Sequence, residues 1–138
     1  MTEPPSGAPP PVTATLRDGE TLDLRSLARD VCARYREEFP DERERYGDTG
    51  MAWCLHDNQH LLNWAVVEAN GFGDFERQLA WLAGVLEARA FPLDRLARDL
   101  ELAAEAMDGE GGRRSAAEIL ASGARLVRSR RSFLDSTG

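Results

Sequence analysis

The sequence has 138 residues, 42% of them hydrophobic, which is the size of a single domain with enough apolar content for a packed core. Its apolar runs stay well short of the ~18 residues of a membrane span, and two cysteines are too few for a disulfide scaffold or a four-thiolate zinc site. The formal net charge of −7 argues against a nucleic-acid partner, because phosphate binding needs a positive surface.

The first 12 residues contain five prolines and almost no apolar side chains. Such a segment cannot bury enough surface to order itself, so we expect a disordered arm over residues 1–12 and one helical domain over residues 13–138. The arm also lacks a basic stretch followed by a hydrophobic one, which is the mark of a secretory signal. We therefore expect a cytoplasmic protein with both thiols reduced.

Residues 13–22 consist of two short alternating stretches that flank Asp18-Gly19. An Asp-Gly pair supplies the positive φ angles of a tight hairpin turn. The pattern predicts a small β-hairpin that must lean on the helices, because an isolated hairpin is marginal in water.

The rest of the chain has the apolar spacing of amphipathic helices joined by short connections. Asp23 and Asp74 are plausible N-caps, and Ser115 with Glu118 has the spacing of a capping box. The predicted helices cover residues 24–39, 48–70, 75–90, 92–107 and 115–134. We therefore predict an all-α protein, an antiparallel four- or five-helix bundle with a short N-terminal hairpin.

Both histidines, His56 and His60, lie four residues apart on the predicted second helix. This spacing can ligate a metal, and the acid after His56 imitates the His-Glu-x-x-His pattern of zinc proteases. That acid is the shorter Asp57, however, and the chain has no third histidine. A helical wheel places both imidazoles opposite the apolar arc, as members of a polar face or as hydrogen-bond partners of an adjoining helix. Metal or haem ligation is therefore the weaker interpretation, and we expect no cofactor.

Asp57 and Glu68 fall inside the apolar arc of the same helix, in a stripe with Trp64. One interpretation is that both acids pair with arginines of neighbouring helices. The other is a ligand pocket walled by tryptophans, with raised carboxyl pKa values. The candidate ligand-binding residues are Trp53, Asp57, Trp64, Glu68 and Trp81.

Apolar residues of the last helix recur in pairs seven residues apart, and Gly123 interrupts their face. The glycine either allows a close helix crossing or merely weakens the helix. The paired face, with arginines beside it, is a candidate interface for a homodimer or a protein partner. Its residues are Ile119, Leu120, Leu126, Val127, Arg130, Phe133 and Leu134.

Residues 53–107 resemble the small helical sensor or linker domains that accompany cobalamin-binding modules in bacterial regulatory proteins. The matching residues are Cys54, Asp57, Leu61, Leu62, Phe75, Trp81, Leu82, Val85, Leu86, Arg89, Pro92, Leu96 and Leu100. Most of them are packing positions, and the chain lacks the Asp-x-His-x-x-Gly motif of a corrinoid carrier. The resemblance therefore implies a stand-alone regulatory bundle and transfers no binding residue.

The sequence contains no Gly-rich phosphate loop, no Gly-x-Ser-x-Gly elbow and no Cys-x-x-Cys pair, so we assign no catalytic residue. Our first hypothesis is a non-catalytic regulatory module that self-associates or docks on a protein partner. The alternative is a sensor of a small ligand, metal or haem built on the helix from Trp53 to Trp64. A small enzyme that uses Asp57 or Glu68 as a base comes third.

Overall fold

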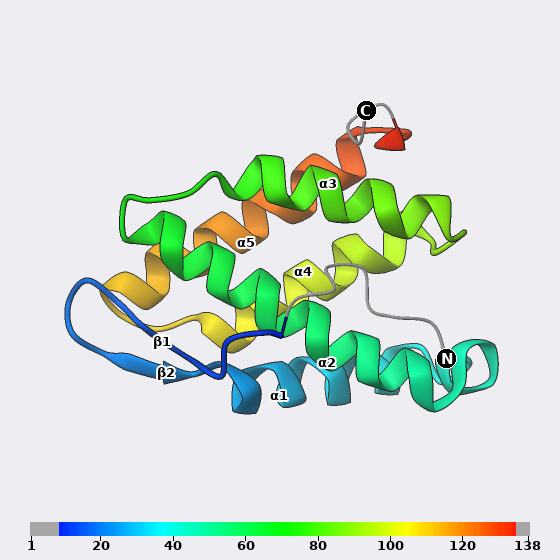
Figure 1. Ribbon diagram of the computed structural model, residues 1–138, viewed down its shortest axis with the longest axis horizontal. Coiled ribbons are helices and arrows are strands. Elements are labelled where there is room, and N and C mark those ends of the chain that lie inside the picture. Colours follow the sequence, from blue (N-terminus) through cyan, green and yellow to red (C-terminus); the bar gives the residue numbers. More distant parts are fainter. Residues whose placement is uncertain (1–8, 135–138) are drawn as a thin grey trace.

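The computed structural model describes residues 9–134, and within this range the chain forms five helices and a two-stranded hairpin (Figure 1). The predicted all-α fold with an N-terminal hairpin is therefore confirmed. None of these helices combines the length and the apolar content needed to cross a bilayer. The elements are β1 (Thr13–Thr15), β2 (Thr21–Asp23), α1 (Leu24–Glu38), α2 (Glu42–Ala69), α3 (Phe75–Ala88), α4 (Leu93–Met107) and α5 (Gly112–Ser129).

The hairpin pairs Thr15 with Thr21, so five residues join its strands instead of the tight turn expected at Asp18-Gly19. Gly19 does adopt the expected positive φ, and the loop folds back so that Leu16 is fully buried. Residues 1–8 of the expected disordered arm lie outside the described part of the chain. The carbonyl of Val12, near the end of that arm, accepts a hydrogen bond from Leu24 N and thereby joins the hairpin to α1.

Several helix ends follow from single residues of the sequence. The carboxylates of Asp23 and Asp74 accept hydrogen bonds from Ser26 N and Arg77 N, as expected of N-caps. The predicted capping box of the last helix is wrong, because α5 begins three residues earlier at Gly112. Its N-terminal amide donates instead to the Asp18 carboxylate of the hairpin loop, at 3.1 Å.

Helix α2 begins earlier than predicted, at Glu42, and has a kink at Gly47. Gly47 has φ 62° and ψ −156°, a conformation open to glycine and costly for other residues. The expected connector over residues 41–47 is therefore a short helical segment set at an angle to the rest of α2. Only the part after the kink matches the predicted helix.

Helix α2 is the centre of the molecule and contacts the four other helices and β1. In Figure 1 it runs diagonally between α1 and α3, with α4 and α5 more distant. The kink at Gly47 interrupts the helical phase, and buried polar residues such as Asn58 and His60 lie among the apolar ones. Over its whole length, α2 therefore separates apolar and polar sides less than α4 and α5 do.

Gly123 lies where α5 crosses α3. A Cβ atom at this position would be 2.8 Å from Cε2 of Phe75 and 2.9 Å from Cδ2 of Leu79, both fully buried side chains. Of the two interpretations of Gly123, the structure supports the close crossing. The loss of helix propensity at this glycine is offset by the contact between the two helices.

We expect Gly123→Val to lower the free energy of unfolding by about 1–3 kcal/mol, because the added methyl groups overpack the α3–α5 crossing. Urea unfolding followed by circular dichroism measures the change. The control is Ser122→Val, which places the same side chain on the exposed face of the same helix. Equal effects of the two substitutions would contradict the close crossing.

Candidate functional site

A cavity of about 80 Å³ lies between α2, α3 and α4, with α1 at its edge. Its volume is several times the ~10–15 Å³ that one water molecule needs. Most of its wall is apolar: four leucines contribute, together with the aromatic side chains of Tyr35, Tyr46, Trp53 and Phe91. The polar groups at the cavity therefore stand out against an apolar background.

The buried polar floor of the cavity is formed by Asn58 of α2 and Asp99 of α4, which are 2% and 7% exposed. Asn58 Nδ2 donates to the Asp99 carboxylate at 3.0 Å and to the carbonyl of Cys54 at 2.9 Å. The other amide atom, Asn58 Oδ1, is buried and receives no hydrogen bond from residues 9–134. Such unsatisfied buried acceptors are rare and costly in native proteins.

Burial raises the pKa of Asp99 from 3.8 to about 7. The carboxylates of Asp57 and Glu42 raise it further, and the hydrogen bond from Asn58 opposes the shift. No arginine within residues 9–134 forms an ion pair with Asp99. Near neutral pH this carboxyl is therefore divided between its neutral and charged forms.

The thiol of Cys54 lies beside the floor and contacts Cys32 of α1, with the two Sγ atoms 2.6 Å apart. Both cysteines are free, as expected from the sequence. The hydrogen bond with Cys32 and then burial raise the pKa of Cys54 well above its ordinary value. At neutral pH the thiol stays protonated and is a poor nucleophile.

Asp57 lines the cavity near Trp53, as the pocket interpretation expected. Burial raises the pKa of its carboxyl, and His56 Nδ1 at 3.2 Å partly compensates. Its hydrogen-bonded partner is thus a histidine of its own helix. The charge of Arg89, an arginine from a neighbouring helix as expected, also lowers the carboxyl pKa. The guanidinium of Arg89, from the end of α3, lies 4.9 Å from the centre of the Trp53 ring.

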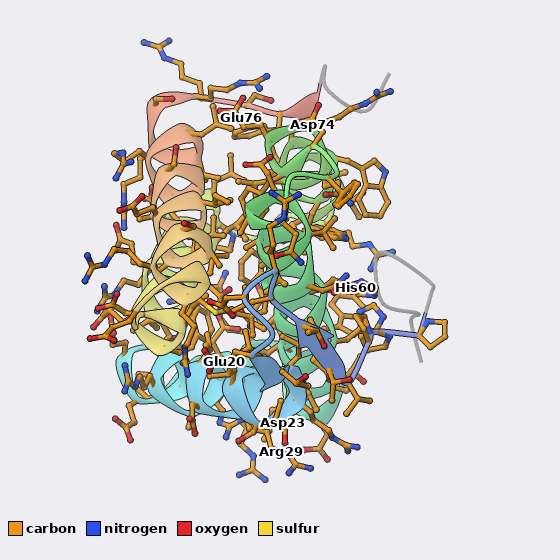
Figure 2. The ribbon with its side chains drawn as sticks, turned by 90° about the vertical axis from the view of Figure 1, so that its left-hand side faces the viewer. Glu20, Asp23, Arg29, His60, Asp74 and Glu76 are labelled. Carbon is orange, nitrogen blue, oxygen red and sulfur yellow. The ribbon has the colours of Figure 1, made fainter. Side chains whose placement is uncertain are left out.

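The other candidate ligand residues do not line this cavity. Glu68 Oε1 accepts a hydrogen bond from Phe75 N at 2.8 Å and so helps to cap α3, which corrects the expected arginine pairing. It borders a separate hollow of about 430 Å³ near Asp74 and Glu76, the end of α3 labelled in Figure 2. Trp64 packs against His60, and Trp81 is 37% exposed on α3.

The interpretation of both imidazoles as part of an exposed polar face is wrong. His60 is only 8% exposed, and its ring lies 4.8 Å from that of His56. Figure 2 shows His60 on the side of α2 where the N-terminal segment runs, and next to it Gln59 Nε2 donates to the carbonyl of Pro11. A helical wheel shows only the helix itself, so it could not predict that another segment of the chain lies on this side of α2. Within residues 9–134, no three His, Cys, Asp or Glu side chains are grouped to hold a metal ion.

The predicted interface on the last helix needs correction, because half of its apolar residues belong to the core. Leu120, Val127 and Phe133 are buried in their own chain, whereas Ile119 and Leu126 are partly buried and Leu134 is 48% exposed. The outer side of α5 is mostly polar. Its basic end pairs within the chain, since the guanidinium of Arg128 donates to the Glu101 carboxylate of α4 at 3.1 and 3.2 Å.

An ion cluster holds the junction between α1 and α2 against α4. The Arg95 guanidinium donates to Glu42 Oε1 at 2.7 Å and to both carboxylate oxygens of Asp41. Tyr35 Oη also donates to Glu42 Oε1, at 2.8 Å. Because Tyr35 and Glu42 line the cavity, this cluster positions part of its wall. The helical wheel places Asn58 inside the apolar arc of α2, but the roles of Asp99 and Arg95 and the missing partner of Asn58 Oδ1 within residues 9–134 were not predicted. Only the packing of α4 on α1 and α2 brings these groups together.

Comparisons of the chain with known protein families, with curated proteins and with solved structures find no match. The resemblance to helical sensor and linker domains therefore stays a prediction.

We expect the stability of the protein to fall as the pH rises from about 4 to about 7. In this window the folded state keeps the Asp99 proton that the unfolded chain has lost, so the unfolded state binds fewer protons. The full effect is on the order of 4 kcal/mol, because one pKa unit corresponds to about 1.4 kcal/mol. Asp99→Asn should remove this pH-dependent contribution. The free energy of unfolding of the variant should therefore increase relative to that of the wild type as the pH rises.

Urea unfolding at a series of pH values measures the difference between the two proteins. The control is Asp30→Asn, the same substitution at an exposed site on α1, which should follow the wild-type profile. A constant difference between Asp99→Asn and the wild type from pH 4 to pH 8 would show that the Asp99 carboxyl has no raised pKa.

Proposed function

We propose that this protein is a non-catalytic sensor domain that binds a small organic molecule in the cavity between α2, α3 and α4. The observation behind the proposal is the combination of apolar walls with an unsatisfied acceptor, Asn58 Oδ1, and a buried acid, Asp99, at the floor. Ligand sites are typically of this kind, mostly apolar with a few convergent polar groups. The cavity is small, so the ligand has few non-hydrogen atoms.

A binding role fits these residues better than an enzymatic one. The only thiol at the cavity is protonated at neutral pH, and the two carboxylates considered as bases are separated by three helical turns of α2. Nucleophilic mechanisms need a nucleophile and a base within hydrogen-bond reach of each other. The cavity instead offers apolar walls and hydrogen-bond acceptors, which suit the binding of a small molecule.

The outer wall of the cavity provides a route from binding to a change of shape. Glu42, Tyr46 and Gly50 lie on both sides of the Gly47 kink, and all three line the cavity. A ligand that fills the space contacts this segment directly and biases its position against the rest of α2. A differential affinity of this kind for two arrangements is what a sensor requires.

We expect 1-propanol, a neutral probe of four non-hydrogen atoms, to bind saturably in the millimolar range. Titration followed by the indole N–H signal of Trp53 in a ¹H–¹⁵N spectrum detects the binding. Leu96→Phe should abolish the shift, because the larger ring fills space at the cavity wall. Leu126→Phe, a partly buried leucine of α5 outside the cavity, is the control for overpacking.

Two further probes, propylammonium and propionate, show whether the cavity binds a small molecule of a different charge. Propylammonium has the same number of non-hydrogen atoms as propanol, and propionate has one more. The three probes differ in charge. If none of the three binds saturably to the wild-type protein, the proposed function is wrong. Binding that persists unchanged in a folded Leu96→Phe protein would place the site elsewhere.

A further inference from the structure

We infer that the cavity selects a small organic cation, a short alkylammonium group held by Asp99 and Asn58 Oδ1 and surrounded by aromatic side chains. This inference rests on the proposed function and names its ligand class. Its basis is the arrangement of three carboxylates, one orphan amide oxygen and four aromatic rings around one cavity. The lining also includes one cation, Arg89, whose guanidinium lies over the Trp53 ring, so the carboxylates at the cavity outnumber its cations by three to one.

The three carboxylates at the cavity differ in how far their charge is compensated. Glu42 accepts hydrogen bonds from Arg95 and Tyr35, and Asp57 has His56 as its partner. Asp99 receives a hydrogen bond from a neutral amide and has no ion-pair partner within residues 9–134. A buried carboxylate without a counter-charge is expensive, so Asp99 is the group that gains most from a cation in the cavity.

The hydrogen-bonding capacity at the floor also favours a donor. Asn58 Oδ1 and the Asp99 carboxylate are both acceptors, and Asn58 uses its amide hydrogens on Asp99 and Cys54. An ammonium group brings three N–H donors and no acceptor, which matches this set. A carboxylate ligand would add a further acceptor and a second negative charge beside Asp99.

The walls fit the carbon end of such a ligand and its charge. Aromatic rings attract ammonium groups through their faces, and four rings line the cavity. Two of these rings, Trp53 and Tyr46, already have a guanidinium over one face, whereas no such contact is found for Tyr35 or Phe91 within residues 9–134. The volume of about 80 Å³ is roughly half that of an engineered cavity that binds benzene, so it accommodates about three or four non-hydrogen atoms. A hard metal ion does not fit, because Ca²⁺ and Mg²⁺ need six or more oxygen ligands, counting water, and this site is mostly apolar.

The test compares propylammonium, 1-propanol and propionate on the full-length protein at pH 7.5, by the same Trp53 indole titration at constant ionic strength. We expect propylammonium to bind at least tenfold more tightly than propanol, and propionate to bind more weakly than either. Equal affinities for propylammonium and propanol would overturn the choice of a cation and leave the sensor proposal intact. Failure of all three probes would overturn the sensor proposal itself.

Asp99→Asn separates charge recognition from the shape of the cavity, because asparagine has nearly the shape of aspartate. We expect this variant to lose at least tenfold in affinity for propylammonium and to keep its affinity for propanol within about twofold. Asp30→Asn, which removes an exposed charge on α1, should leave both affinities unchanged. If Asp99→Asn retains the preference for propylammonium, Asp99 is not the counter-charge and the inference is wrong.

Discussion

The central position of α2 imposes one requirement on the rest of the structure: the polar side chains that this helix places against its neighbours need hydrogen-bond partners there. Gln59 finds one in the Pro11 carbonyl, Asn58 in Asp99, and Glu68 in the first amide of α3. Each of these bonds ties α2 to a different segment of the chain. The same helix therefore joins the N-terminal segment, α3 and α4 through polar contacts as well as through the core.

The contact between Asn58 and Asp99 is the exception. Their hydrogen bond leaves Asn58 Oδ1 without a donor and the Asp99 carboxylate without a counter-charge within residues 9–134. Apolar residues of similar size at these two positions would give a more stable protein, since an uncompensated buried acid is costly. Sites where local stability is sacrificed tend to be functional ones. Under the proposed function, the same cost would give a ligand with hydrogen-bond donors its affinity, because such a ligand supplies the donors that the free protein lacks.

Much of the fold could be predicted from the sequence, and the site only in part. Helical spacing and the capping residues Asp23 and Asp74 are local signals, so four helices and the hairpin were found nearly in place. The early start of α5 depends on a tertiary contact, the hydrogen bond from Gly112 N to Asp18. The kink at Gly47 depends on the positive φ of one glycine, which the spacing of apolar residues does not reveal. For the site, the wheel placed Asp57 correctly and His60 wrongly, because it assumed that α2 has one buried side. Asp99 gave no signal, since an acid in an amphipathic helix is ordinarily solvated.

The ion cluster at Arg95 connects the cavity to the most irregular part of the backbone. Arg95 holds Asp41 and Glu42, which begin α2, and these residues lie within six positions of the Gly47 kink. The same turn of α4 supplies Leu96 and Asp99 to the cavity. A shift of α4 therefore moves these two residues and the ion cluster at Arg95 together. A ligand that neutralises Asp99 removes a repulsion between this carboxylate and those of Asp57 and Glu42, both of which raise its pKa. Under the proposed function, the free and occupied forms would thus differ in the electrostatic force on the start of α2.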